Sequence, residues 1–168
     1  ILIRDRSGRD VSSVVANVIF SVKMGGDPSL LNYCKMFDGA TPKTLELSQE
    51  EINDAIAKVP TEVVETLQEA ADRITAFHKA QIKKGYTLEA DGVKLIQKIL
   101  PLEKVGIYIP GGTAAYPSTV LMNAIPAKIA NVGEIVMVSP PTDNGSISPV
   151  ILAAARIAGV DRVFRIGG

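Results

Sequence analysis

The 168-residue sequence contains one cysteine, one histidine and no tryptophan, and its 18 basic and 18 acidic side chains cancel. A single cysteine, Cys34, cannot form an internal disulfide, so a reducing, cytoplasmic setting is expected. Zero net charge with only 21% charged residues leaves no basic footprint for nucleic acid or an anionic membrane. The longest uncharged stretch, 105–127, contains prolines and a glycine pair, which favours a soluble core over a membrane-spanning helix. We therefore expect neither nucleic acid nor a membrane as a partner.

Charge is unevenly distributed along the chain. Residues 1–100 contain 27 charged side chains, whereas residues 101–168 contain 9. The first value is typical of half-exposed amphipathic helices, and the second of a parallel sheet that is covered on both faces. This contrast predicts a helical arm with a β-hairpin over residues 1–100 and an α/β unit over residues 101–168.

Residues 1–100 show helical periodicity followed by a hairpin signal. Helices are predicted from Asp10 to Gly25-Gly26, from Asp27-Pro28 to Phe37, after the Ser48–Glu51 capping box, and from Pro60 to Gly85. Val14, Val15 and Ile19 recur at the spacing of an amphipathic helix. In the helix after Pro60, the stripe that includes Leu67, Ala71 and Phe77 is expected to face inward. The segments 86–90 and 93–97 flank Asp91-Gly92, a strong signal for a tight β-hairpin.

From residue 101 onward, apolar strand segments alternate with helical segments. Strands are predicted at 105–109, 135–138 and 163–166, and helices at 119–130 and 149–158. This βαβαβ order predicts a parallel sheet with right-handed crossovers. The expected fold class is α/β, an incomplete Rossmann-like unit preceded by the helical arm and the β-hairpin. Pro126 is expected to kink or split the first crossover helix.

Both termini indicate a piece of a longer polypeptide. The sequence does not begin with methionine, and it stops at Gly167-Gly168 directly after a predicted strand. Three parallel strands form a small sheet with exposed edges. We expect the α/β unit to continue beyond residue 168 in the parent protein.

A glycine-rich loop at 109–118 follows the first parallel strand and precedes a helix. Ligands in open α/β sheets bind at the carboxyl ends of strands, so this position fits a cofactor. The spacing matches neither the G-x-G-x-x-G fingerprint nor the phosphate-binding loop with its lysine. The residues alone therefore leave a plain tight turn as the alternative.

Three side chains near this edge are candidate contacts. Tyr108, the penultimate residue of a predicted strand, can place its ring against a flat ligand, or it can be a core tyrosine with a satisfied hydroxyl. Ser118 is a possible substrate contact, although the residues favour it as the N-cap of the following helix. Phe37 precedes a turn and is expected to be a core anchor, with packing on an adenine ring as the alternative.

The chain offers little for acid–base or metal chemistry. His78 lies at the edge of an apolar stripe with no carboxylate or cysteine near it in sequence, which favours a satisfied, half-buried histidine. Cys34 is expected to be a small core residue. One histidine and one cysteine cannot supply the usual nitrogen and sulfur ligands of zinc.

A long run of residues resembles one known family. The run from Val105 to Lys128, VGIYIPGGTAAYPSTVLMNAIPAK, is similar to the glycine-proline signature region of histidinol dehydrogenases. The similarity continues through residues 134–141 and 158–161. Gly26-Asp27, Phe37-Asp38 and Phe77-His78 also fall where that family has them. The resemblance covers essentially the whole chain but well under half of the family's usual length.

The resemblance implies an oxidoreductase of histidine biosynthesis, which uses zinc and oxidises L-histidinol to L-histidine through histidinal in two NAD-dependent steps. It implies NAD contacts at Tyr108, Pro110 and Phe37, and places Ser118 at the mouth of the substrate pocket. The family's catalytic Glu/His pair and its zinc ligands lie beyond this C-terminus, so no catalytic or metal-binding residue is assigned here. The chain alone is then expected to be inactive. The family also forms intertwined homodimers.

Two other hypotheses stay open beside a portion of this enzyme. One is a non-catalytic α/β folding or interaction module that retains the scaffold, which an open reading frame ending at residue 168 would favour. The other is nucleotide binding by this chain alone, which requires Tyr108 and the glycine-rich loop to suffice.

Overall fold

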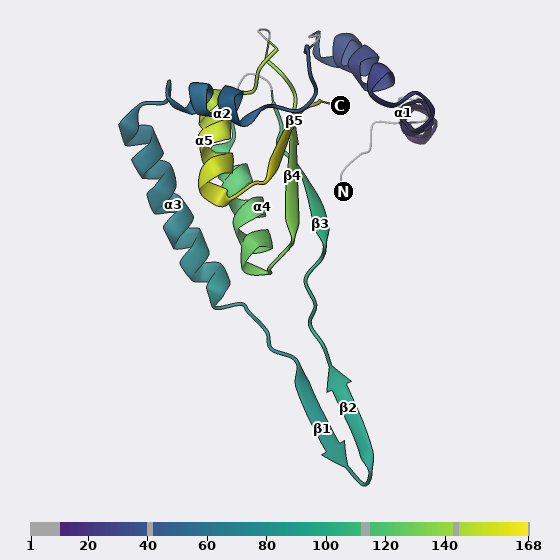
Figure 1. Cartoon of the computed structure of the whole chain (residues 1–168), viewed down its shortest axis with the longest axis vertical. Coiled ribbons are helices and arrows are strands. Elements are labelled where there is room, and N and C mark those ends of the chain that lie inside the picture. The colour runs from purple at the N-terminus through teal and green to yellow at the C-terminus, as the bar shows by residue number, and fades with distance from the viewer. Residues whose placement is uncertain (1–10, 40–41, 112–114, 143–144, 168) are drawn as a thin grey trace, which may run out of the picture.

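The computed structural model describes residues 11–39, 42–111, 115–142 and 145–167 (Figure 1). In chain order the elements are α1 (Val11–Tyr33), the π-helical segment η1 (Cys34–Asp38), α2 (Gln49–Ile56), α3 (Thr61–Lys79), β1 (Tyr86–Ala90), β2 (Val93–Gln97), β3 (Lys104–Tyr108), α4 (Pro117–Ile129), β4 (Glu134–Ser139), α5 (Pro149–Ala158) and β5 (Arg162–Arg165). Strands β3, β4 and β5 form a parallel sheet in that order, and β1 and β2 form an antiparallel hairpin. The α/β class, the hairpin and the βαβαβ order are therefore confirmed.

Helices α4 and α5 lie on the same face of the β3-β4-β5 sheet (Figure 1). Both crossovers run in the same direction along the strand order, so the right-handed rule places both helices on one side. The burial pattern of β4 agrees, because Ile135 and Met137 are fully buried whereas Val136 and Val138 are half-buried. The expectation of a sheet covered on both faces is wrong for the residues that the structure describes.

One hydrophobic core joins α2 and α3 to the α/β unit. Leu67 and Ala71 of α3 and Ile52 of α2 belong to the same cluster as the buried residues of α4, β4 and α5. The segment before α2 also extends the sheet, because Leu47 N donates to Val163 O at 2.9 Å. The core thus draws residues from both sides of residue 100, and the division of the chain there stays a prediction.

Local signals placed several element boundaries correctly. Ser48 and Glu51 form the predicted capping box at the start of α2. Gly26, with φ of 57°, interrupts the helical geometry of α1 where a break was expected. Helix α3 ends at Lys79, six residues before the predicted stop at Gly85. Gly85 instead allows a close approach to the backbone of Gln97 at the base of the hairpin, where a Cβ would collide.

Helix α4 continues unbroken from Pro117 to Ile129 through Pro126, so the predicted split does not occur. Pro126 cannot donate to the carbonyl of Met122 four residues earlier. Met122 is 61% exposed, which places this unmatched carbonyl on the surface side of the helix. Water can therefore satisfy it at small cost.

Two apolar surfaces lack a partner within the described part of the chain. On α1, Val14 and Ile19 are 54% and 62% exposed, and no residue of that helix is buried. The hairpin projects away from the rest of the molecule and is exposed on both faces (Figure 1). Phe77 of α3 is also exposed. The predicted inward-facing stripe of α3 is confirmed at Leu67 and Ala71 but not at Phe77. Periodicity identifies an apolar stripe but not what covers each of its members.

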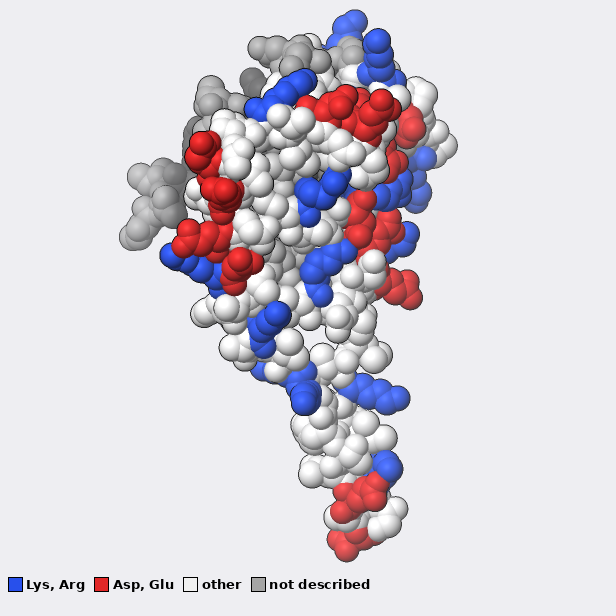
Figure 2. Space-filling model, turned by 60° about the vertical axis from the view of Figure 1, so that its left-hand side comes forward, with Lys and Arg blue, Asp and Glu red and all other residues white. Residues whose placement is uncertain are grey.

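Acidic and basic side chains are interspersed over the face shown in Figure 2, with wide uncharged areas between them. Ion pairs account for part of this pattern, for example Lys94 with Glu89 on the hairpin and Lys128 with Asp161 below α4. Among the described helices, none is long and apolar enough to cross a membrane.

Asp161 ties α4, β4 and β5 together at the amino edge of the sheet. Its carboxylate accepts hydrogen bonds from Lys128 Nζ at 2.9 and 2.8 Å and from the backbone N–H of Ile135 at 2.7 Å. Burial opposes ionisation of this group, but the Lys128 and Ile135 donors outweigh it and hold the pKa of Asp161 below its ordinary 3.8. The ion pair is 34% and 38% exposed, so solvent weakens it.

We expect Asp161→Asn to lower the free energy of unfolding by about 1 kcal/mol at neutral pH, because the charge-assisted bonds are lost. A carboxylate with a depressed pKa contributes stability above its unfolded pKa and loses it as pH falls through the folded pKa. The difference between wild type and variant should therefore shrink when the pH is lowered from 7 to about 3. Urea unfolding at both pH values measures this, with Glu69→Gln in the exposed pair with Arg73 as a near-neutral control. A difference of equal size at both pH values would contradict the assignment.

The end of β5 rests on η1 through a glycine. Gly167 packs so closely on Asp38 that a Cβ would collide with the Asp38 carboxylate. Burial raises the pKa of that carboxyl, and the backbone N–H of Gly167 partly offsets the rise by donating to it. Beside it, the Cys34 thiol lies 4.0 Å from the carbonyl oxygen of Arg165.

We expect Gly167→Ala to destabilise the protein by roughly 1–3 kcal/mol, because the added methyl collides with the Asp38 carboxylate and forces that side chain out of its contact with the Gly167 N–H. Gly106→Ala is the matched control, since a Cβ at Gly106 meets nothing within 4 Å and the loss of unfolded-chain entropy is then favourable. Thermal unfolding of both variants measures the difference. Equal melting temperatures for the two variants would rule out the close packing described.

Candidate functional site at the carboxyl edge of the sheet

The loops that leave β3 and β4 pack against each other at the carboxyl edge of the sheet. A Cβ at Gly111 would lie 2.6 Å from Cγ of Pro140, so this position accepts only glycine without a shift of the loops. The glycine-rich loop is therefore more than a turn, because one of its glycines is required by contact with the neighbouring loop. Residues 112–114 of the loop lie outside the described residues.

Tyr108 lies on the open face of the sheet, opposite α4 and α5. Its neighbour Ile109 is fully buried toward the helices and donates its N–H to Val138 O at 2.9 Å. Tyr108 therefore points the other way, and it is 51% exposed. The prediction of a core tyrosine does not hold within the described residues, whereas an aromatic surface at the carboxyl edge is present.

An apolar row crosses the open face beside Tyr108. Tyr108 pairs in register with Val138, and Val138 with Phe164. Gly106, two residues before Tyr108 on the same face, leaves the adjoining space free of side chain. These residues form a shelf, which we define as Tyr108, Val138 and Phe164, at the edge where ligands of parallel α/β sheets bind.

Charged residues mark the amino-terminal limit of this shelf. Arg162 donates to both carboxylate oxygens of Glu46 at 2.8 and 2.7 Å and lies 4.9 Å from the Phe164 ring centroid. Glu134 pairs with Lys104 at 2.5 Å and lies 3.6 Å from Arg162. Hydrogen bonds from Arg162 and Lys104 respectively hold the pKa values of Glu46 and Glu134 below their ordinary range. The open face is thus polar at one end and apolar at the other.

The other predicted contact residues, Pro110 and Ser118, lie near the same edge of the sheet. Pro110 is half-buried and follows Tyr108 by two residues. Ser118 is exposed in the first turn of α4, which begins at Pro117 with Tyr116 as N-cap. The prediction that Ser118 caps this helix is therefore wrong, because proline is favoured at the first helical position and the helix begins one residue before Ser118.

Phe37 lies on a different element from the shelf. It belongs to η1, stacks on Tyr33 with ring centroids 5.5 Å apart, and is 52% exposed. The prediction of a core anchor does not hold among the described residues. Phe37 lies near the end of β5, because Phe37, Ile166 and Gly167 line the same small hollow, and Cys34 and Asp38 of η1 contact the chain there.

Arg165 is a site residue that sequence reasoning missed. It ends β5, its side chain is 8% exposed, and it pairs with Glu51 at 2.7 Å. Its guanidinium also donates to Thr44 Oγ1 at 3.0 Å and to Gly145 O at 3.4 Å. The available signal was a basic residue within the apolar strand segment 163–166, where a charge is rare unless it is paired.

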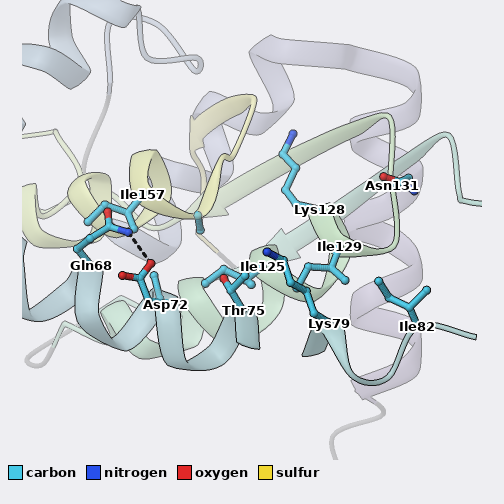
Figure 3. A pocket seen from close by; sticks show the side chains of 12 residues that line it. Gln68, Asp72, Thr75, Lys79, Ile82, Ile125, Lys128, Ile129, Asn131 and Ile157 are labelled. Atoms are coloured by element: carbon cyan, nitrogen blue, oxygen red, sulfur yellow. Dashed lines mark hydrogen bonds between the residues drawn. The ribbon is translucent and has the colours of Figure 1, made fainter. Parts of the chain in front are cut away.

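A hollow of about 410 Å³ lies elsewhere, between α3 and α4 (Figure 3). It is lined by the carboxyl-terminal parts of α4 and α5, which lie at the amino edge of the sheet. Its polar groups are partly paired with each other, since Gln68 Nε2 donates to Asp72 Oδ1 at 3.0 Å (Figure 3). None of the predicted contact residues lines this hollow, so we place the candidate site at the carboxyl edge.

His78 and Cys34 are both engaged in contacts within the described structure. His78 of α3 has its Nδ1 2.7 Å from Oε1 of Gln81, just after that helix, which confirms a satisfied, half-buried histidine. Cys34 is 2% exposed, and burial together with the nearby Asp38 raises the pKa of its thiol, so it is a core residue. Within the described ranges, no group of three or more His, Cys, Asp or Glu side chains could hold a metal ion. The arrangement suits binding of a flat ligand.

Comparisons with known proteins all indicate one family. The family described as histidinol dehydrogenase matches residues 3–168. A histidinol dehydrogenase of Prochlorococcus marinus is 52% identical over 157 residues, which cover 93% of this chain and 36% of that protein. One from Geobacter sulfurreducens is 46% identical over 169 residues, which cover 98% and 39%.

The fold comparison agrees with the sequence comparisons. The crystal structure of histidinol dehydrogenase from Elizabethkingia anophelis matches with a TM-score of 0.92 and 37% identity, over 98% of this chain and 38% of that chain. The chain thus spans 36% to 39% of the length of these relatives. It belongs to the histidinol dehydrogenase family.

Proposed function

We propose that this chain forms the cofactor-side portion of a histidinol dehydrogenase, which oxidises L-histidinol to L-histidine through histidinal in two NAD-dependent steps. Family membership supports the reaction. The single structural observation that carries the local role is the shelf, with Tyr108 half exposed at its edge. The chain then supplies binding surface for the nucleotide, and the rest of the enzyme supplies the chemistry.

The residues at the carboxyl edge fit a dinucleotide in shape and polarity. The ring of Tyr108 offers a flat apolar face with a hydroxyl at its end, a combination suited to a ribose or an amide. The contact of Gly111 with Pro140 brings backbone close to the edge without a side chain in between. We assign NAD contacts to Tyr108 and Pro110, and a further one to Phe37. When bound, NAD accepts a hydride in each of the two oxidations.

Ser118 is proposed at the mouth of the substrate pocket, where its exposed hydroxyl can orient the polar substrate L-histidinol. Its place in the first turn of α4, next to the glycine-rich loop, supports this role. The described residues do not fit zinc, because they contain no suitable ligand group. The zinc ligands and the acid–base pair are proposed to come from outside residues 1–168.

The apolar surfaces of α1 and the hairpin are proposed to be covered in the complete homodimeric enzyme. An isolated two-stranded hairpin is marginally stable in water, and here Leu88 and Leu95 are 56% and 60% exposed. Contacts with the rest of the polypeptide and with a second copy would bury them. A cytoplasmic location stays a prediction from the single cysteine.

We expect Tyr108→Ala to weaken NAD binding by the full-length enzyme about tenfold, because an aromatic contact and its buried area are lost. The Michaelis constant for NAD should rise by a similar factor, while turnover at saturating NAD changes less. Isothermal titration with NAD and initial-rate measurements test this. Tyr108→Phe separates the hydroxyl from the ring.

Tyr86→Ala is the matched control for this experiment. Tyr86 is also an exposed strand tyrosine, at 56%, but it lies on the hairpin, far along the chain from the glycine-rich loop. It should leave the NAD affinity unchanged. Loss of NAD affinity in both variants, or in neither, would overturn the placement of the nucleotide.

We expect the isolated chain of residues 1–168 to show no histidinol-dependent formation of NADH with zinc present, since neither an acid–base pair nor a zinc site is found among its described residues. The full-length protein should turn over under the same conditions. An absorbance assay at 340 nm on both samples decides this. Turnover by the isolated chain would overturn the division of labour proposed here.

A further inference from the structure

Arg165 is the only charged side chain buried among the described residues. It ends β5 beside Ser139 of β4, at the carboxyl edge of the sheet. A buried guanidinium is costly unless its donors are paired, so its partners indicate what it holds in place. It faces the helix side of the sheet together with Val163, so it does not lie on the shelf.

The guanidinium connects segments that are distant in sequence. Nη2 donates to Glu51 Oε1 at 2.7 Å, Thr44 Oγ1 at 3.0 Å and Glu46 O at 3.3 Å, while Nη1 donates to Gly145 O at 3.4 Å. The backbone N–H of Ser48, followed by Arg165, lowers the pKa of Glu51, so this partner is charged at neutral pH. One arm therefore holds the start of α2, and the other holds the loop between β4 and α5.

One N–H donor of the Arg165 guanidinium has no hydrogen-bond acceptor among the described residues. Nε is buried and has no hydrogen-bond partner in the part of the chain that the structure describes. A purely structural role would be served as well by apolar packing, which carries no such cost. A costly group at the ligand-binding edge of a sheet is typical of a functional position.

The loop held by Nη1 leads back to the glycine-rich loop. Within it, Thr142 N and Thr142 Oγ1 donate to Ser146 O at 2.7 and 2.8 Å, and Gly145 N donates to Thr142 O at 2.7 Å. Prolines 140 and 141 fix the backbone between this turn and β4. Pro140 then packs on Gly111, which directly follows Pro110. A continuous set of contacts thus runs from Arg165 to the loop that carries the nucleotide contacts.

We propose that Arg165 is a positioning residue of the nucleotide site, which fixes the β4–α5 loop and, through Pro140, the glycine-rich loop. It touches neither nucleotide nor substrate. This inference rests on the proposed function, because it assigns to NAD binding the loop that Gly111 anchors on Pro140. Its effect is to reduce the ordering that the loop must undergo when NAD binds, which improves affinity without changing the chemical step.

The test is Arg165→Lys in the full-length enzyme. A lysine keeps the charge but is a point donor that cannot reach Glu51 and Gly145 together. We expect the dissociation constant and the Michaelis constant for NAD to rise about three- to tenfold, with turnover at saturating NAD retained. Hydrogen–deuterium exchange should become faster at the backbone amides of Gly111 and Gly145, which end the described contacts of the two loops.

Glu51→Gln is the matched control, because it weakens the other arm of Arg165 and leaves the Gly145 arm intact. It should lower thermal stability while NAD affinity and loop exchange stay as in wild type. Gly145→Ala strains the loop at a φ of 75° and should weaken NAD binding as Arg165→Lys does. The double variant should then bind NAD no worse than either single variant, since both act on one loop.

The outcomes test the positioning role of Arg165 separately from NAD binding by the enzyme. Equal effects of Arg165→Lys and Glu51→Gln on NAD affinity would reduce Arg165 to a general stabiliser and overturn the inference, as would an Arg165→Lys variant with unchanged affinity. Wild-type enzyme that fails to bind NAD overturns the proposed function instead. The exchange measurement then still decides whether Arg165 orders the two loops.

Discussion

Two successive right-handed crossovers in one direction place α4 and α5 on the same face of the β3-β4-β5 sheet. The other features depend on this arrangement. The covered face buries Ile135, Met137 and Val163 and forms the core with α2 and α3. The opposite face keeps Tyr108, Val138 and Phe164 accessible at its carboxyl end. A helix on that face would have buried the tyrosine, so handedness and strand order together leave an aromatic side chain exposed there within the described residues.

The accessible face needs an ordered edge to be useful, and this edge is built from close contacts between loops. Gly111 against Pro140 joins the loops after β3 and β4, and Arg165 ties the second of these loops to α2. Each contact restricts the backbone, so under the proposed function less entropy would be lost when NAD binds. The charged residues around Arg162 perform a different task, because they fill the polar end of the open face and confine the apolar shelf to the other end.

Local signals in the sequence predicted local structure well. The Asp91-Gly92 turn, the Ser48–Glu51 capping box and the βαβαβ order all appear as expected, because each depends on residues that are near in sequence. The resemblance of residues 105–128 to one family identified that family correctly. Tyr108, singled out from its place in a strand, is half exposed at the carboxyl edge, and its contact with NAD stays a prediction.

Two of the misses share one physical origin, which is dependence on distant partners. The side chain of Phe77 was expected to face inward and is exposed, since periodicity reports an apolar face and not its cover. Arg165 could not be found from its neighbours in sequence, because its partners Glu51 and Thr44 precede it by more than a hundred residues. Ser118 was misplaced for a local reason, since Pro117 competes for the helix start and wins.

The proposed function separates a binding surface, which the described residues contain, from acid–base and metal chemistry, which it assigns to residues outside 1–168. A shelf for a flat ligand can be made locally, because one sheet edge and two loops suffice to shape it. Acid–base and metal chemistry requires several polar groups to converge around the reacting carbon, and within the described residues His78 and Cys34 are both engaged elsewhere. Under the function proposed above, acid–base and metal-binding groups would therefore approach the open face of the sheet, where the shelf lies. The exposed apolar side chains of the hairpin lie away from that face (Figure 1), so covering them requires a separate contact.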